Sequence, residues 1–446
     1  MPTTRSDRRA LRRASVALLL LVPVSGCSDD DAPTPEPAPE QSGEAVHAPD
    51  VVRSLTRLLD RRAEAVRLDD RDAFLAGVAV ADPAFQKDQE TYFANLEQLP
   101  VGEFWYAVDP ASLTRSGGDY WAEVDVTLEL EGYDEVPVAT RDRYRFSQRK
   151  GRFRVSSVTD AAWEDEHDVR AQPWDDGPVT VRYGSGVLGV FDDGSAPKAG
   201  EVVADVETGI ADVSARVPYD WEPRVVVYAL SDPAFLSGLE DVPGDDPLAL
   251  DGIAFPVPAS PDGGRTADTR FLLSPRMLDA RGEARARLIR HELTHVAVGS
   301  RADGVPTWLS EGIAEYVSVR PIRPEDRVLS EDALDAAEAG ITRMPGDEDF
   351  EGPDREVSYG VAWWACEYVA ATYGEDLLWF LIESVGSDDD PDEALESTLG
   401  FGTNALARRG ARLMLQRYRP EPSASSSPSG SASESASGSP SGSPTD

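Results

Sequence analysis

Cysteine is scarce in this sequence, which has 2 cysteines among its 446 residues, Cys27 and Cys366. A fold held together by several disulfides is therefore excluded, and the chain must rely on a hydrophobic core. Hydrophobic residues make up 41% of the chain, which over this length is enough for the cores of two domains. Cys366 lies in a stretch with helical periodicity, so we expect it to be a small core residue.

Positive charge is also in short supply. The chain has 43 lysines and arginines against 81 aspartates and glutamates, and its formal net charge is -38. Nucleic acids and anionic lipid surfaces are negatively charged, so both are poor partners for the folded domains and we expect no nucleic-acid partner. The acidic balance either favours basic peptides as ligands or serves solubility, and composition leaves both interpretations open.

The apolar stretch from Leu18 to Val24 is too short to span a membrane. It follows an arginine-rich start and ends in Val24-Ser25-Gly26-Cys27, so residues 1–27 are predicted to be a secretory signal. The last four residues resemble a bacterial lipobox. This resemblance implies that Cys27 is lipidated and anchors an extracytoplasmic lipoprotein to the bacterial cell membrane. An ordinary signal peptide with an incidental cysteine is the alternative.

Two segments lack the apolar residues that a core needs. Residues 28–50 are rich in aspartate and alternating proline, and we expect a disordered tether. Residues 421–446 consist mainly of serine, proline, glycine and alanine, and we expect a disordered tail. The acidic run Asp388-Asp389-Asp390 is either a calcium ligand set or, as is commoner, a solvated run of charges.

The most informative stretch is His291-Glu292-Leu293-Thr294-His295. An HExxH pattern arises by chance in roughly a third of a percent of chains with this composition. On a helix, His291 and His295 lie one turn apart on the same face, so that both imidazoles can bind one metal ion about 2 Å away. Glu292 lies beside that ion, where it can take a proton from a metal-bound water. The pattern predicts a catalytic zinc site with Glu292 as general base.

A catalytic zinc needs a third protein ligand, and a second helix is predicted shortly after the first. Leu309, Ile313 and Val317 form an apolar stripe that leaves Glu311 and Glu315 together on another face. We assign Glu311 as the third ligand, although spacing alone leaves the reverse assignment open.

HELTH followed by Trp308-Leu309-Ser310-Glu311-Gly312-Ile313-Ala314-Glu315-Tyr316 resembles the gluzincin zinc metallopeptidases, in particular their peptidase MA-like branch. The resemblance covers roughly residues 178–420. It implies peptide-bond hydrolysis, with His291, His295 and Glu311 as zinc ligands. It also implies that Glu315 orients the first histidine.

Tyr359, in Ser358-Tyr359-Gly360, loosely resembles the tyrosine that donates to the oxyanion in related aminopeptidases. We predict that it stabilises the transition state. A structural tyrosine packed on Trp363 is the alternative, because Val361-Ala362 departs from the pattern of that family.

Residues 51–170 are predicted to form an accessory α+β domain, with three helical pieces before residue 99 and four strands between residues 104 and 158. This order resembles the nuclear transport factor 2-like cone on architecture alone, a fold that carries many functions. The segment shows no catalytic constellation. We expect His47 and His167 to be solvated.

Residues 178–420 are predicted to form the peptidase domain, with a mixed α/β subdomain followed by a mostly helical half. We expect one strand to edge the cleft beside the HELTH helix, where it can pair with an extended peptide. The aromatic residues of the helical half are predicted to be core: Trp363, Trp364, Tyr368, Trp379 and Phe380. The competing hypothesis is an inactive peptidase-fold lipoprotein that serves binding or envelope assembly.

Overall fold

The computed structural model describes residues 44–45, 49–167, 169, 171–232, 235, 250–386 and 390–420. The predictions for the signal, for Cys27, for His47, for Asp388 and Asp389, and for the tail lie outside these residues. No helix in the described part is long and apolar enough to cross a membrane.

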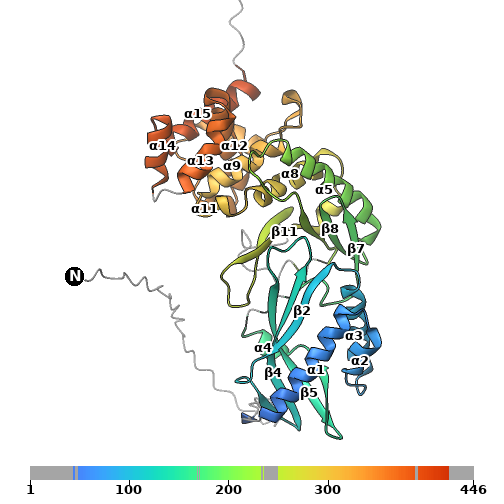
Figure 1. Ribbon diagram of the computed structural model, residues 1–446. Helices are drawn as coiled ribbons and strands as arrows, with labels where there is room; N and C mark the ends of the chain where they lie inside the picture. Colours follow the sequence, from blue (N-terminus) through green and yellow to red (C-terminus); the bar gives the residue numbers. More distant parts are fainter. Residues whose placement is uncertain are drawn as a thin grey trace, which may run out of the picture. The chain divides into compact units, whose positions relative to one another are not determined.

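The N-terminal part begins with three helices and continues into an antiparallel sheet (Figure 1). The helices are α1 (Pro49–Arg67), α2 (Arg71–Ala76) and α3 (Pro83–Leu96). The strands are β2 (Val101–Val108), β3 (Thr114–Ser116), β4 (Asp119–Leu130), β5 (Val138–Arg149) and β6 (Arg152–Ser157), and a short helix α4 (Ala161–Glu164) follows. The three helical pieces and the four longer strands predicted from the sequence are confirmed.

One further strand begins this sheet. β1 (Glu44–Ala45) pairs with β3, which pairs in turn with β4, and α1 begins at Pro49. The tether predicted to reach residue 50 therefore contains residues that belong to secondary structure. Two residues are too short a run for the alternation that identifies a strand in sequence.

The second sheet is mixed and has the order β10-β11-β9-β8-β7. β7 (Val179–Gly184) and β8 (Val187–Asp192) form a hairpin, and helix α5 (Ala199–Ser214) then leads to β9 (Val225–Ala229), parallel to β8. β11 (Thr266–Leu273) is parallel to β9, and β10 (Gly252–Pro258) is the antiparallel edge strand. The fold is α+β, with one antiparallel and one mixed sheet, as predicted at that level.

Successive residues of the mixed sheet enter two different cores. Val225, Val227 and Phe271 belong to a cluster with the helices that follow the sheet. Val226, Tyr228 and neighbouring positions belong to a cluster with α1, α3 and the antiparallel sheet. Because both faces are covered, the strands read as continuous apolar runs such as Val225–Ala229. The antiparallel sheet therefore packs through side chains against one face of the mixed sheet.

The C-terminal half is helical (Figure 1). Its helices are α7 (Pro275–Asp279), α8 (Glu283–Val298), α9 (Thr307–Ser318), α10 (Glu331–Ala339), α11 (Asp347–Glu351), α12 (Arg355–Tyr373), α13 (Glu375–Gly386), α14 (Pro391–Leu399) and α15 (Thr403–Tyr418). Short 3-10 turns lie at Gly299–Ala302 and Pro324–Asp326 between these helices, and another at Ala196–Lys198 precedes α5.

The predicted aromatic core is largely confirmed. Trp363, Trp364 and Trp379 are buried, and Cys366 is a buried free thiol. Phe380 is 51% exposed, so its assignment to the core was wrong. It follows Trp379 directly, and on α13 the neighbour of a buried residue points about 100° away from it.

Candidate metal centre

Helix α8 carries the histidine pair and is held by two buried arginines. Arg285 donates to Asp205 and Glu201 on α5, and Arg290 donates through Nε to the carbonyl oxygen of Ser318 on α9 at 2.7 Å. A buried guanidinium that binds several acceptors fixes the elements that supply them. The rotation of α8 about its axis is therefore set from two sides.

Helix α9 approaches α12 closely because Gly312 has no side chain. A Cβ atom at this position would lie 2.6 Å from the carbonyl oxygen of Ala362 and 2.8 Å from Sγ of Cys366. Any larger residue would push the two helices apart. The close packing of α9 on α12 therefore also fixes the position of the neighbouring residue, Glu311, relative to α8.

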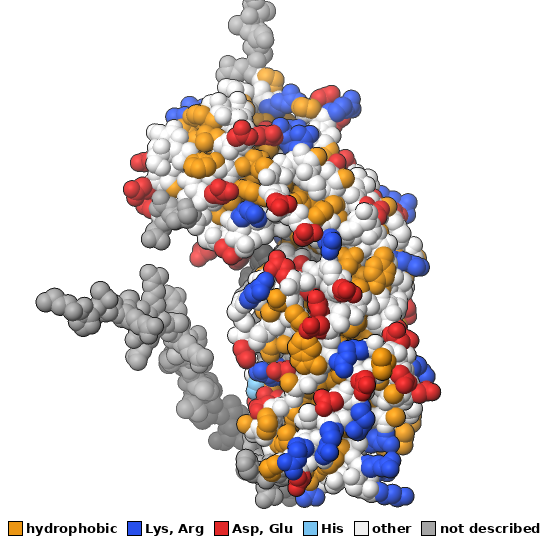
Figure 2. All heavy atoms as spheres, viewed as in Figure 1, with side chains coloured by type: hydrophobic (Ala, Val, Ile, Leu, Met, Phe, Trp, Pro, Cys, Tyr) orange, Lys and Arg blue, Asp and Glu red, His pale blue; other side chains and the backbone are white. Residues whose placement is uncertain are grey.

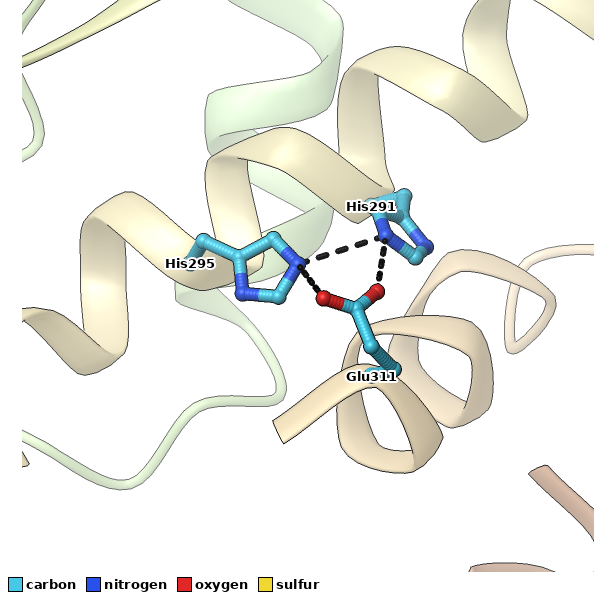
Figure 3. A group of neighbouring side chains, drawn as sticks. All are labelled: His291, His295 and Glu311. Carbon is cyan, nitrogen blue, oxygen red and sulfur yellow. Dashed lines mark hydrogen bonds and ion pairs between the residues drawn. The ribbon is translucent and has the colours of Figure 1, made fainter. Parts of the chain in front are cut away.

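The two helices bring together His291, His295 and Glu311 (Figure 3). Nε2 of His291 lies 3.1 Å from Oε2 of Glu311, and Nε2 of His295 lies 3.5 Å from Oε1 of the same carboxylate. The two Nε2 atoms are 3.3 Å apart. These three residues could hold a metal ion.

Electrostatics at this cluster favour a positive charge between the three side chains. Burial lowers the pKa of His291, but its contacts with Glu311 and Glu315 outweigh burial and hold that pKa well above its ordinary value. Burial raises the pKa of Glu311, but the positive field of His295 and the hydrogen bond with His291 bring it below its ordinary range. A metal cation would supply the same positive charge and displace a proton.

Glu315 lies behind His291, on the side away from Glu311. Its Oε1 atom is 3.2 Å from Nδ1 of His291, although the alignment falls short of a hydrogen bond. Arg287 donates to the other oxygen of Glu315, and its guanidinium lies over the ring of Trp363. Burial raises the pKa of Glu315, but His291 and Arg287 bring it down to about 2, so the carboxylate stays ionised.

Two contacts at the centre were not anticipated from the sequence. Oγ of Ser310 lies 3.4 Å from Nδ1 of His295, which places a hydroxyl behind the second histidine as Glu315 lies behind the first. Arg287, which holds Glu315, also donates to the carbonyl oxygen of Val328 at 3.2 Å. Ser310 immediately precedes Glu311, so helical geometry could have suggested the first contact, whereas the second depends on a distant loop.

Glu292 is buried and 6% exposed. Its Oε2 atom accepts a 2.8 Å hydrogen bond from the main-chain N–H of Ala254 in β10, and its Oε1 atom has no hydrogen-bond partner among the described residues. Burial raises the pKa of Glu292, although the two histidines lower it in part. A carboxylate with a raised pKa and one free oxygen is suited to accept and return a proton.

Tyr359 on α12 lies at the same centre. Its ring is 6.1 Å from that of His291, and it packs edge-on against Phe350 at 5.3 Å. Burial, and then the charges of Glu311, Glu292 and Glu315, raise the pKa of the phenol well above its ordinary value. The phenol of Tyr359 therefore stays protonated, and the residue lines the cleft described next.

A cleft of about 1130 Å³ opens onto these residues. Edge strand β10 forms one wall along its whole length, and Val169, residues 171–173, residues 176–179 and the turn at residues 192–194 continue the lining. The described lining residues include no lysine or arginine, whereas they include Asp176, Asp193 and Asp232. The expected strand at the edge of the cleft is β10.

His167 does not join the centre. It is exposed, its ring stacks on that of Trp163, and its Nδ1 lies 2.7 Å from the carbonyl oxygen of Trp163.

Comparisons of the chain with protein-family models and with curated proteins found no match.

Proposed function

We propose that this chain is a zinc-dependent metallopeptidase of gluzincin type, related to the peptidase MA-like branch. The observation that carries the proposal is the triangle of donor atoms, with edges of 3.1, 3.3 and 3.5 Å. In a tetrahedral site with bonds of about 2.0 to 2.1 Å, two ligand atoms lie about 3.3 Å apart. Two imidazoles and one carboxylate are also the donor set typical of a catalytic zinc that keeps one position open.

The bound zinc would supply Lewis acidity and lower the pKa of a water molecule in its open position toward neutrality. The residues of the chain then have distinct tasks. The free oxygen of Glu292 accepts a proton from the attacking water and returns it to the leaving amine. Glu315 keeps the Nε2 atom of His291 directed at the centre, and Tyr359 donates to the oxygen that becomes negative in the transition state.

The substrate class that fits the cleft is an extended peptide with basic side chains. As an edge strand, β10 lines the cleft beside His291 and Glu292. Its outer row offers mainly carbonyl groups to an extended peptide, because the N–H of Ala254 is taken by Glu292 and Pro256 has no N–H. The acidic lining of the cleft attracts cationic groups, because no basic side chain among its described residues offsets it. The acidic composition of the chain left basic peptides open as ligands, and the acidic lining of the cleft is a surface on which they could bind.

We further propose that the protein is an extracytoplasmic lipoprotein anchored through Cys27 and that residues 51–170 are an accessory domain with the nuclear transport factor 2-like fold. The helices-then-curved-sheet order supports the second assignment. The boundary near residues 170–178 stays a prediction, since the two parts share one hydrophobic cluster.

The decisive experiment is metal analysis of the purified protein, beginning at Ser28, together with cleavage of a mixed peptide library. We expect one zinc per chain and cleavage that stops with a chelator and returns when zinc is restored. Cleavage products should show basic residues near the scissile bond. Bound zinc without any cleavage would favour the inactive binding module, and a protein that binds no zinc would refute the proposal.

A further inference from the structure

The hairpin formed by β5 and β6 is strongly basic in an otherwise acidic chain. Residues 143–154 contain five arginines and Lys150 but no aspartate or glutamate, whereas the whole chain has a net charge of -38. Basic side chains are numerous over the lower part of the face drawn in Figure 2, the region of α1 and β5 in Figure 1. Charge is therefore distributed unevenly, and the net charge that makes the chain as a whole a poor partner for anionic lipid surfaces does not describe this hairpin.

The arginines share one face of the sheet. Tyr144, Phe146 and Val155 point into the core, so the alternate residues of both strands point outward. The register places Ser147 opposite Arg154 and Arg149 opposite Arg152. All five arginines therefore lie on the outward face, and Lys150 lies in the turn between the strands.

The tip of the hairpin places like charges directly opposite each other. Arg149 and Arg152 are cross-strand partners, and both are exposed, as is Lys150. Like charges in this position destabilise a hairpin unless a counter-charge is present. Among the described residues, neither arginine nor Lys150 forms an ion pair, although Asp119 begins β4 at the same end of the sheet.

Two arginines of β5 that lie further from the tip form ion pairs. Arg141 pairs with Asp125 and Asp262, and Arg143 pairs with Asp160. Acidic partners are therefore present at Arg141 and Arg143, and none is present at the tip among the described residues. An external anion would offset the repulsion that the tip contains.

The tip lies at the end of the sheet where the N-terminal segment joins it. Across the neighbouring strands, Glu44 of β1 pairs with Arg115 of β3, Arg115 pairs with Tyr120 of β4, and Tyr120 pairs with Phe146 of β5. Because β1 is antiparallel to β3, Glu44 at the start of β1 lies toward the end of the sheet at which β5 reaches Arg149. The segment from Cys27 to Glu44 can span on the order of 50 Å when extended.

We propose that the tip formed by Arg149, Lys150 and Arg152 docks on the anionic phospholipid head groups of a membrane. The occupant is a lipid surface rather than a soluble polyanion because the tip lies at the end of the sheet that leads to the proposed lipid anchor. Docking through the tip fixes this end of the sheet against the membrane. The proposal is independent of the metal centre.

The test is vesicle co-sedimentation of the protein beginning at Ser28, with Cys27 removed so that no acyl chain contributes. This protein keeps the whole unit of residues 43–446. Vesicles of phosphatidylcholine alone are compared with vesicles that contain phosphatidylglycerol as well. We expect binding only to the second kind, and we expect the affinity to fall as salt is added.

The matched variants each remove three positive charges. Arg149→Gln, Lys150→Gln and Arg152→Gln together should weaken binding about a hundredfold, since each cation near an anionic surface contributes about fivefold. Arg408→Gln, Arg412→Gln and Arg417→Gln, at exposed positions of α15, should leave binding nearly unchanged. The tip variant should melt at the same temperature as the parent or higher, because a repulsive pair is removed.

Two results would overturn the proposal. The first is an equal loss of binding in both triple variants, which would assign the effect to net charge. The second is binding to a soluble polyanion such as heparin, lost in the tip variant, without binding to the anionic vesicles. That result would identify the tip as a site for a soluble polymer.

Discussion

The main-chain N–H of Ala254 in β10 donates a 2.8 Å hydrogen bond to Oε2 of Glu292 in α8. This contact joins the edge strand of the cleft to the candidate general base. A peptide paired with β10 would thus be placed relative to Glu292 by one hydrogen bond. The same contact occupies one carboxylate oxygen and leaves the other without a hydrogen-bond partner among the described residues.

The first prediction is that Glu292→Gln retains bound zinc and loses at least about a hundredfold in turnover, the usual scale for loss of a general base. The amide oxygen can still accept from Ala254, so the fold and the position of the side chain should be preserved. Zinc content by mass spectrometry and the rate of peptide cleavage check this. Cleavage at the parental rate would remove Glu292 from the mechanism.

The second prediction ranks the two glutamates of α9. Glu311→Ala should lose most bound zinc, because it removes a donor atom from the triangle. Glu315→Ala should weaken zinc binding by about ten- to a hundredfold, because it frees the ring of His291 without removing a ligand. Zinc titrations decide the order, with Glu356→Ala at an exposed position as control. The reverse ranking would exchange the two roles.

The third prediction concerns the fit of α9 against α12. Gly312→Ala should destabilise the protein by about 1 to 3 kcal/mol, since the added methyl group meets backbone and a buried sulfur at 2.6 and 2.8 Å. It should also weaken zinc binding, because Glu311 moves with the helix. Gly200→Ala is the matched control, since no atom lies within 4 Å of its added Cβ. Equal melting temperatures for the two variants would contradict the packing argument.

Local periodicity was sufficient to predict the cluster of side chains that could hold a metal ion. His291 and His295 lie one turn apart on the same helix, and Glu311 lies on the next helix. The periodicity of the two helices is therefore enough to identify these three residues. Arg287 and Ala254 could not be predicted, because their contacts depend on how β10 and α9 pack against α8. Phe380 was misassigned for the same reason, since an apolar residue becomes core only where a neighbouring element covers it.

The fourth prediction separates two roles for Tyr359. Tyr359→Phe keeps the ring and its contact with Phe350 but deletes the hydroxyl. If the phenol donates to the developing oxyanion, kcat should fall by two orders of magnitude or more, since such a donor contributes roughly 3 to 4 kcal/mol. Substrate affinity, zinc content and Tm should stay close to those of the parent. A loss of Tm without a loss of kcat would make Tyr359 a structural residue.

The fifth prediction concerns Asp268, a largely buried carboxylate in β11 that is 15% exposed. Its Oδ2 atom has no hydrogen-bond partner in the described part of the chain and lies 3.8 Å from Nε of Arg270. Burial raises the pKa of Asp268 to about 7; Arg270 lowers it in part, and Asp134 raises it further. Between about pH 4 and pH 7, the carboxyl group of Asp268 is therefore protonated in the folded protein and ionised in the unfolded chain.

The sign of the stability change follows from that proton. A carboxyl whose pKa is raised on folding contributes stability at low pH, and this contribution is lost as pH rises from about 4 to about 7. At about 1.4 kcal/mol per pH unit, the parent should lose about 3 kcal/mol between about pH 5 and pH 8 through this group. Asp268→Asn cannot ionise, so its unfolding free energy relative to the parent should rise by a similar amount over that range. Urea unfolding at both pH values measures the difference, with Asp60→Asn on the exposed face of α1 as control. A difference that is the same at both pH values would mean that Asp268 ionises at its ordinary pKa in the folded protein.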